Sequence, residues 1–184
     1  MLRETQLWVY GDGRSCRVVA ADTAVNCDFL LGQAQVAHRA RLDDVAAAVA
    51  SWLVARVPVC ELTTRIPGVE LERHAEVLET DPARWHWLHV GDRIADSSDV
   101  LAPLAHLLEA LAESPVATSF YSYSSLSRFC FSASSHSPWV DAGLPVVAPA
   151  SPGVYMVDST PCDRSRAIER IEAALATAPL RPFF

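Results

Sequence analysis

The first forty residues alternate between apolar and polar side chains, which is the pattern of strands with one buried face. Strands are predicted at residues 6–10, 16–21, 24–31 and 35–41. The first two are joined by Gly11-Asp12-Gly13, and an Asp-Gly pair between apolar runs favours a tight hairpin. Gly32 separates the last two strands. The pattern therefore predicts an N-terminal antiparallel meander.

From residue 42 onward the apolar spacing changes to the helical period of about 3.6 residues. A helix is predicted over residues 42–53, capped by Asp43 or Asp44 and ended by Pro58. One stripe of this helix is apolar: Leu42, Val45, Val49, Trp52 and Leu53. The helix is therefore expected to cover the meander. A second helix is predicted over residues 69–79, after a break at Pro67-Gly68.

The later helices are marked by cap and proline signals. Thr80-Asp81-Pro82 predicts a helix start, because proline suits the unpaired amides of a first turn. The clearest helix is predicted over residues 96–113, with an apolar stripe of Leu101, Leu104, Leu108 and Leu111 and with His106 exposed. Thr160-Pro161-Cys162-Asp163 reads as a capping box that starts the last helix, and Pro179 ends it. Its predicted buried stripe is Ile168, Ile171 and Leu175.

Aromatic and hydroxyl side chains alternate between residues 118 and 139. A strand here places Tyr121 and Tyr123 on one face, and a Ser124-Ser125 turn is expected after it. A second strand places Phe129 and Phe131 on one face. The opposite, mixed face carries Arg128, Cys130 and Ser132. These features predict a central hairpin, followed by short strands at residues 145–148 and 154–157.

Together these patterns predict an α+β fold. An antiparallel sheet in one part or two, built from the N-terminal meander and the central hairpin, would be covered by four or five helices. A chain of 184 residues that is 51% hydrophobic can form one sizeable core. Because no internal repeat or linker divides the sequence, a single α+β domain is expected over residues 1–184.

The charge balance excludes several classes of function. The formal net charge is −7, and all 15 basic residues are arginine, since the sequence has no lysine. Without lysine there is no Schiff-base chemistry and no phosphate-loop lysine. An acidic chain without a basic cluster also argues against partners that are nucleic acids or anionic membranes. No cofactor is implied by any motif, and homodimerisation is left open.

The cysteines and the first residues of the chain give information about the cellular compartment of the protein. The five cysteines are widely spaced and form no CxxC pair, which favours free thiols. No apolar run approaches the roughly 20 residues that a membrane helix needs, and the start of the chain lacks the apolar core of a signal peptide. A cytoplasmic location is therefore expected.

Groups capable of acid/base chemistry could converge near the central hairpin. Arg128 could clamp an anion, since an arginine in an uncharged strand needs water, a carboxylate or an anionic ligand. His136 could act as general acid or base, with Asp141 orienting it. The predicted catalytic residues are therefore His136, Arg128 and Asp141. The predicted substrate-binding residues are Tyr121, Tyr123, Trp139 and Trp85. The alternative to this catalytic role is that Arg128 and His136 are solvent-exposed side chains without a function in catalysis.

Other residues suggest chemistry less strongly. His86 and His89 lie three positions apart on a predicted helix and could chelate a metal, but no third ligand has a convincing spacing, so no metal is predicted. Cys130 lies between two phenylalanines, surroundings that raise a thiol pKa and keep it unreactive. The sequence contains no GxSxG, HExxH or GxGxxG motif.

Several short matches resemble a known family. They are Trp52-Leu53, Glu61-Leu62, Trp85, Ser124-Ser125 and Phe131-Ser132, within residues 42–157. The pattern resembles an uncharacterised bacterial family labelled natural product biosynthesis protein. The family is expected to carry a histidine directly after the paired hydroxyls, where this chain has Leu126. The resemblance implies a role in making a secondary metabolite and specifies neither a reaction nor catalytic residues.

The leading hypothesis is a cofactor-independent tailoring enzyme of natural-product, or antibiotic, biosynthesis. It would cyclise, isomerise or eliminate a small or peptide-derived substrate by acid/base chemistry. The alternatives are a non-catalytic interaction protein (an immunity, carrier or scaffold partner) and a protein that only binds a small molecule. A concave pocket at the hairpin would favour the enzyme, whereas a flat exposed patch around Trp85 and His89 would favour an interaction protein.

Overall fold

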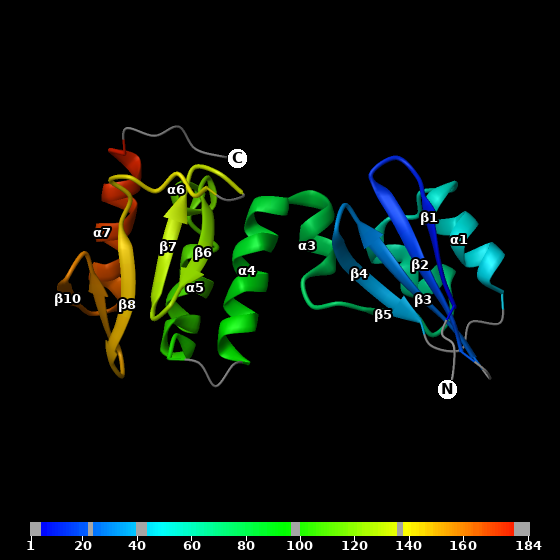
Figure 1. Ribbon diagram of the computed structural model, residues 1–184, viewed down its shortest axis with the longest axis horizontal. Coiled ribbons are helices and arrows are strands. Elements are labelled where there is room, and N and C mark those ends of the chain that lie inside the picture. The colour runs from blue at the N-terminus through cyan, green and yellow to red at the C-terminus, as the bar shows by residue number, and fades with distance from the viewer. Residues whose placement is uncertain (1–4, 22–23, 40–43, 97–99, 136–137, 179–184) are drawn as a thin grey trace. The chain divides into compact units, whose positions relative to one another are not determined.

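The computed structural model describes residues 5–21, 24–39, 44–96, 100–135 and 138–178. Its contacts divide the chain into two compact units, Met1–Asp81 and Pro82–Phe184 (Figure 1). Each unit combines helices with its own antiparallel five-stranded sheet, so the predicted α+β class is confirmed. The meander belongs to the first sheet and the central hairpin to the second. A single domain over residues 1–184 stays a prediction.

The four predicted strands of the N-terminal meander are confirmed. The first sheet has the order β1-β2-β3-β4-β5. Its strands are β1 (Thr5–Tyr10), β2 (Arg14–Ala21), β3 (Ala24–Leu31), β4 (Ala34–Arg39) and β5 (Glu70–Leu71). Gly13 and Gly32 take positive φ angles of 70° and 60° in the tight turns, a conformation that glycine adopts without a steric penalty.

The fifth strand corrects the prediction of a helix over residues 69–79. Glu70 and Leu71 pair with His38 and Ala37 of β4, and α3 begins only at Ala75 (Ala75–Thr80). The backbone groups on the outer edge of β4 need partners, and this pairing supplies them. A local helical spacing of apolar residues gives no information about that requirement.

The predicted helix that covers the meander is confirmed as α1 (Val45–Leu53). The Asp44 side chain caps it by accepting a hydrogen bond from the backbone N–H of Ala47 at 2.9 Å. The alternative cap, Asp43, lies outside the described residues. Trp52 is fully buried and packs edge-to-face on Phe29, with 6.1 Å between ring centroids. The chain leaves the helix at Val54, before Pro58, and continues through η1 (Val59–Glu61) and α2 (Leu62–Arg65).

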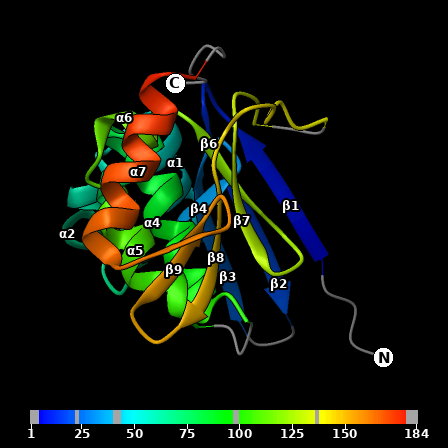
Figure 2. The same cartoon turned by 90° about the vertical axis from the view of Figure 1, so that its left-hand side faces the viewer.

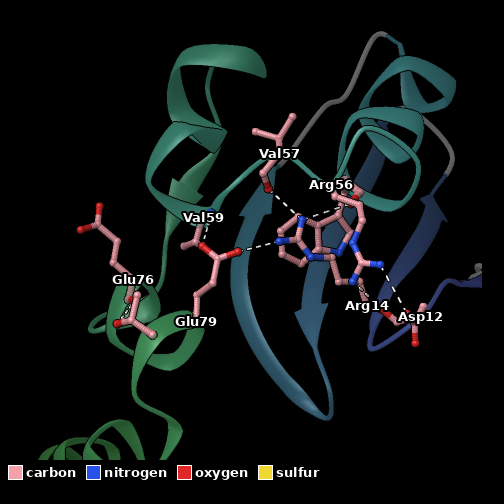
Figure 3. Close-up of polar contacts among 9 residues, drawn as sticks. Asp12, Arg14, Arg56, Val57, Val59, Glu76 and Glu79 are labelled. Atoms are coloured by element: carbon pink, nitrogen blue, oxygen red, sulfur yellow. Dashed lines mark hydrogen bonds and ion pairs between the residues drawn. The ribbon is translucent and has the colours of Figure 1, made fainter.

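A buried arginine connects the elements of the first unit (Figure 3). Arg14 is 8% exposed, and its Nη1 donates to the carbonyl oxygens of Trp52 at 3.3 Å and Val57 at 2.8 Å. Its Nη2 donates to Glu79 Oε1 at 2.6 Å, and Cζ lies 4.0 Å from the Trp52 ring centroid. Glu79 Oε2 accepts from the backbone N–H of Val59 at 2.8 Å. The ion pair of Arg14 and Glu79 therefore connects β2, α1, η1 and α3.

The second unit has a sheet of order β10-β9-β8-β7-β6, packed against helices. Its strands are β6 (Tyr121–Ser125), β7 (Arg128–Ser132), β8 (Val146–Ser151), β9 (Val154–Val157) and β10 (Thr160–Cys162). Its helices are α4 (Pro82–Ala95), η2 (Ala102–Leu104), α5 (Ala105–Leu111), α6 (Pro115–Thr118) and α7 (Arg164–Ala176). Figure 2 shows α4, α5 and α7 on one side of strands β7, β8 and β9.

The core of this unit lies between the helices and one face of the sheet. Phe129 and Phe131 are fully buried there, as their alternation in the sequence predicted, and both pack on Trp87. The predicted leucine stripe is confirmed: Leu101, Leu104, Leu108 and Leu111 are at most 1% exposed. Burying a leucine contributes about 1.5–3 kcal/mol, so this stripe is a large part of what holds η2 and α5 in the core of the second unit.

Two predicted helices differ from those observed. Residues 97–99 of the helix predicted over residues 96–113 lie outside the described residues. In the described part, the 3₁₀ turn η2 precedes α5, and Pro103, which has no N–H, lies in that turn. The predicted capping box at Thr160 is instead the edge strand β10, where Pro161 pairs with Met156. An edge strand tolerates a proline that a helix start would also accept. Asp163 caps α7 instead, accepting from the backbone N–H of Arg166 at 2.9 Å.

Candidate functional site

A cleft of about 550 Å³ lies in the second unit, between α4 and the outer edge of β6. β6 is the last strand of its sheet, so one side of it has no strand neighbour among the described residues. The described residues that line the cleft are Trp85, His86, His89, Val90, Arg93, Ile94, Leu101, Tyr121, Ser122, Tyr123, Ser124 and Trp139.

Helix α4 supplies one wall of the cleft. Trp85, His89 and Arg93 are spaced four residues apart, which places them in one row along a helix. The rings of Trp85 and His89 stack with centroids 4.9 Å apart. Trp87 points the other way into the core, where its Nε1 donates to the carbonyl oxygen of Phe120 at 3.1 Å. The helix therefore has one face that anchors it and another that lines the cleft.

Strand β6 supplies the opposite wall. The central hairpin is confirmed, but its turn is at Leu126 and Ser127 rather than at the predicted Ser124-Ser125, because Ser125 still pairs with Arg128. Leu126 takes a φ of 54°, the left-handed conformation that tight hairpins require. The two extra strand residues extend β6 and bring Ser124 to the cleft.

Aromatic rings form a continuous stack along this wall. Trp139 stacks on Tyr123 at 4.5 Å and on Tyr121 at 5.8 Å between centroids. Tyr121 in turn lies against the His86 imidazole at 4.1 Å. The rings in each pair are within 25° of parallel. Nearly parallel faces beside an open cleft suit a flat apolar or aromatic group.

His86 joins the helix to the edge of β6. Its Nε2 lies 3.0 Å from Ser122 Oγ, 3.2 Å from the Ser122 carbonyl oxygen and 3.3 Å from the Ser122 amide nitrogen. Burial lowers the pKa of His86 to about 4, because the charged imidazolium is poorly solvated there. The imidazole is therefore neutral at physiological pH, and it occupies the outward backbone groups of Ser122.

A phenol and a carboxylate form the second polar pair of the site. The Tyr123 hydroxyl donates a hydrogen bond to Asp141 Oδ2. Desolvation and this hydrogen bond to the carboxylate raise the pKa of Tyr123 well above its ordinary value of about 10. Tyr123 therefore keeps its proton. Desolvation also raises the pKa of the Cys130 thiol on the neighbouring strand, which matches its predicted lack of reactivity.

The structure brings together the four predicted substrate-binding residues. Trp85, Tyr121, Tyr123 and Trp139 all line the cleft, although they come from α4, β6 and the chain after β7. Of the predicted catalytic residues, Asp141 reaches the cleft through Tyr123. Arg128 is exposed beside the hairpin turn and is not among the described residues that line the cleft. His136 lies outside the described residues.

Sequence reasoning missed three participants in this site: His86 as a cleft residue, Ser122 as its partner, and Arg93. The row of Trp85, His89 and Arg93 on the predicted helix was a usable signal, since a core-facing stripe would not contain arginine. The contact between His86 and Ser122 had no such signal, because 36 residues separate them in sequence.

The described residues contain no group of three or more histidine, cysteine, aspartate or glutamate side chains that could hold a metal ion. His86 and His89 both line the cleft, but Nε2 of His86 is taken by Ser122 and the His89 ring stacks on Trp85. The arrangement supports ring stacking and hydrogen bonding.

Comparisons with known proteins add no assignment. The chain matches no protein-family model, no curated protein and no solved structure. Among the helices in the described part of the chain, none combines the length and apolar character that crossing a membrane requires.

Proposed function

We propose that the protein is a cofactor-independent tailoring enzyme of natural-product biosynthesis, and that its small or peptide-derived substrate binds in the cleft between α4 and β6. One observation carries the proposal: aromatic side chains from three separate segments converge on one cleft of about 550 Å³ together with polar groups. A volume of about 550 Å³ is typical of small-molecule sites, and the aromatic walls combined with polar groups offer both stacking and hydrogen bonds to such a ligand.

The polar groups suit proton transfer without a cofactor. Asp141 would accept a proton from the substrate, while Tyr123 hydrogen-bonds that carboxylate and remains a neutral phenol. Neutral His86 would orient the edge of β6 and the Tyr121 ring rather than exchange protons, because its pKa is too low for a general base near pH 7. His136 remains the proposed general acid or base, and Trp139, three positions later, lies in the cleft.

The second candidate function is binding of the same molecule without turnover. It is favoured by one observation: burial lowers the pKa of the cleft residue His86 and holds its imidazole neutral. The interaction-protein alternative expected a flat patch around Trp85 and His89. Both side chains instead line the cleft, which supports a small-molecule ligand over a protein partner.

The remaining parts of the proposal follow from composition. An acidic, lysine-free chain fits a cytoplasmic protein that acts on a small molecule and does not bind nucleic acid or a membrane. Homodimerisation is compatible with this function and is not required by it, since the described lining of the cleft comes from one unit of one chain.

Native mass spectrometry with extract from a metabolite-producing bacterium tests the proposal. Wild-type protein, His136→Ala and the matched control His106→Ala are each incubated with the extract; His106 is an exposed histidine on α5, and its side chain is 83% exposed. We expect wild type and His106→Ala to bind a small molecule and change its mass, and His136→Ala to bind it unchanged. Binding without a mass change in all three proteins would favour the second candidate. Binding of a protein-sized partner alone would overturn both.

A further inference from the structure

The outer edge of β6 presents a backbone amide and carbonyl to the cleft at Ser124. Successive residues of an antiparallel strand direct their N–H and C=O groups alternately toward and away from the neighbouring strand. The backbone N and O of Ser122 both contact His86 and therefore point away from β7. Ser124, two residues later, has the same orientation. Its backbone groups face the cleft, where no described strand pairs with them.

A cation, Arg93, lies on the opposite wall. Arg93 lines the cleft from the last turns of α4, and it makes no hydrogen bond or ion pair with any other residue that the structure describes. Arg93 lies seven residues, about two helical turns, after His86 on α4, and it lines the same cleft as Ser124.

We propose that the cleft binds an extended peptide that ends in an aromatic residue with a free carboxylate. The peptide backbone pairs with the N–H and C=O of Ser124 as an added strand on β6, a common mode of peptide recognition. Its aromatic ring stacks against Tyr123 and Trp139, and its terminal carboxylate binds Arg93. This inference rests on the proposed function and narrows its substrate class from small molecules in general to linear peptides.

The chemistry of the three groups selects this ligand over a simple aromatic acid. An aromatic acid satisfies the rings and Arg93 but leaves the amide and carbonyl of Ser124 to water. A peptide can contact the aromatic rings, Arg93 and the backbone of Ser124 together. An edge strand with free backbone groups is a template for a further strand. In a chain of net charge −7, Arg93, which has no ionic partner among the described residues, also gives an anionic terminus a local attraction.

Isothermal titration calorimetry with defined peptides tests the proposal. The probe is acetyl-Ala-Ala-Phe with a free carboxylate, compared with its C-terminal amide, with versions N-methylated at each amide in turn, and with 3-phenylpropanoate. N-methylation at one position is expected to weaken binding about tenfold, since it removes a hydrogen bond and blocks strand pairing. The amide and 3-phenylpropanoate are expected to bind at least about tenfold more weakly than the parent peptide.

Variants separate the two contacts. Ser124→Pro removes the outward N–H without breaking the bonds to β7, since an edge strand accepts proline there, and it should weaken the peptide about tenfold. Ser124→Ala keeps the backbone N–H, so a larger loss of affinity in Ser124→Pro than in Ser124→Ala is expected. Arg93→Gln should weaken the free-carboxylate peptide and leave the amidated peptide unchanged. Arg164→Gln, an exposed arginine at the start of α7, should affect neither.

The outcomes distinguish this inference from the proposed function. If 3-phenylpropanoate binds as tightly as the peptide and N-methylation has no effect, strand pairing is wrong while the cleft remains a small-molecule site. If Arg93→Gln leaves the free-carboxylate peptide unaffected, the terminal-carboxylate contact is wrong. If neither peptide nor 3-phenylpropanoate binds, while the bacterial extract still yields a bound molecule, the substrate class is wrong and the cleft function stands.

Discussion

Replacing Glu79 tests whether the Arg14 cluster holds the first unit together. Arg14 is 8% exposed, and Glu79 is the only acidic partner of its guanidinium among the described residues. Glu79→Ala removes the counter-charge and also the acceptor for the backbone N–H of Val59. Removing one partner of a buried pair costs about 3–5 kcal/mol, because the remaining charge is desolvated without compensation.

Partial exposure of the pair sets the magnitude within that range. The Glu79 side chain is 26% exposed, so water can replace part of the carboxylate, and we expect Glu79→Ala to cost about 3 kcal/mol. Glu79→Gln keeps an oxygen for the backbone N–H of Val59, but its amide NH2 is a donor and cannot accept from Arg14, so the variant loses the charge and the bond to Arg14, and about 1.5–2 kcal/mol is expected. The matched control is Glu76→Gln on the same helix. Glu76 is exposed and points away from Arg14 in Figure 3, so its loss should change stability by less than about 0.5 kcal/mol.

Native-state hydrogen exchange followed by mass spectrometry measures this effect within one unit. Protection in peptides from β2 and α1 should fall in the order Glu76→Gln, Glu79→Gln, Glu79→Ala. Peptides from α5, in the second unit, serve as an internal reference. If Glu79→Ala and Glu76→Gln exchange alike in β2 and α1, the ion pair contributes nothing measurable and the reasoning is refuted.

Three further predictions concern the second unit. The pKa of His86 is about 4 in the folded protein and about 6.5 in the unfolded chain. Between these pH values only the unfolded chain binds a proton at this histidine, so lowering the pH favours unfolding. The free energy of unfolding should therefore fall by about 3 kcal/mol as the pH drops from 6.5 to 4. Urea denaturation across this range should show a smaller pH dependence in His86→Gln and an unchanged one in His106→Gln; equal dependence in all three would contradict the assignment. The raised pKa of Tyr123 predicts that Tyr123→Phe removes absorbance change at 295 nm from the most alkaline part of a titration, above the ordinary value of about 10; a loss near that value would argue against the Asp141 contact. Gly91→Ala should raise the free energy of unfolding by about 0.5–1 kcal/mol, because alanine favours the interior of α4 more than glycine does. The added Cβ would lie at an ordinary contact distance of 3.7 Å from Leu108. Destabilisation in urea denaturation would contradict this and indicate a steric clash between α4 and α5.

The candidate site was only partly predictable for a clear physical reason. Alternation along one strand is a local property, so the shared face of Tyr121 and Tyr123 followed from the sequence, and both rings do meet Trp139. Which helix closes over that strand is not a local property. His86 meets Ser122 across 36 residues, and the burial that keeps its imidazole neutral exists only once α4 lies against β6.

The amino-acid sequence by itself determined the period of each element. The strands of the meander, the buried stripe of leucines and the opposite faces of the central hairpin all follow from the spacing of apolar residues. The tertiary structure decided which residues became the partners of the unpaired backbone groups and buried charges of these elements. Glu70 and Leu71 became a strand because β4 needed a partner, and Arg14 found its counter-charge at Glu79, 65 residues away. Hydrophobic spacing is read along the chain, whereas hydrogen bonds and charges are satisfied by whatever the fold brings into contact.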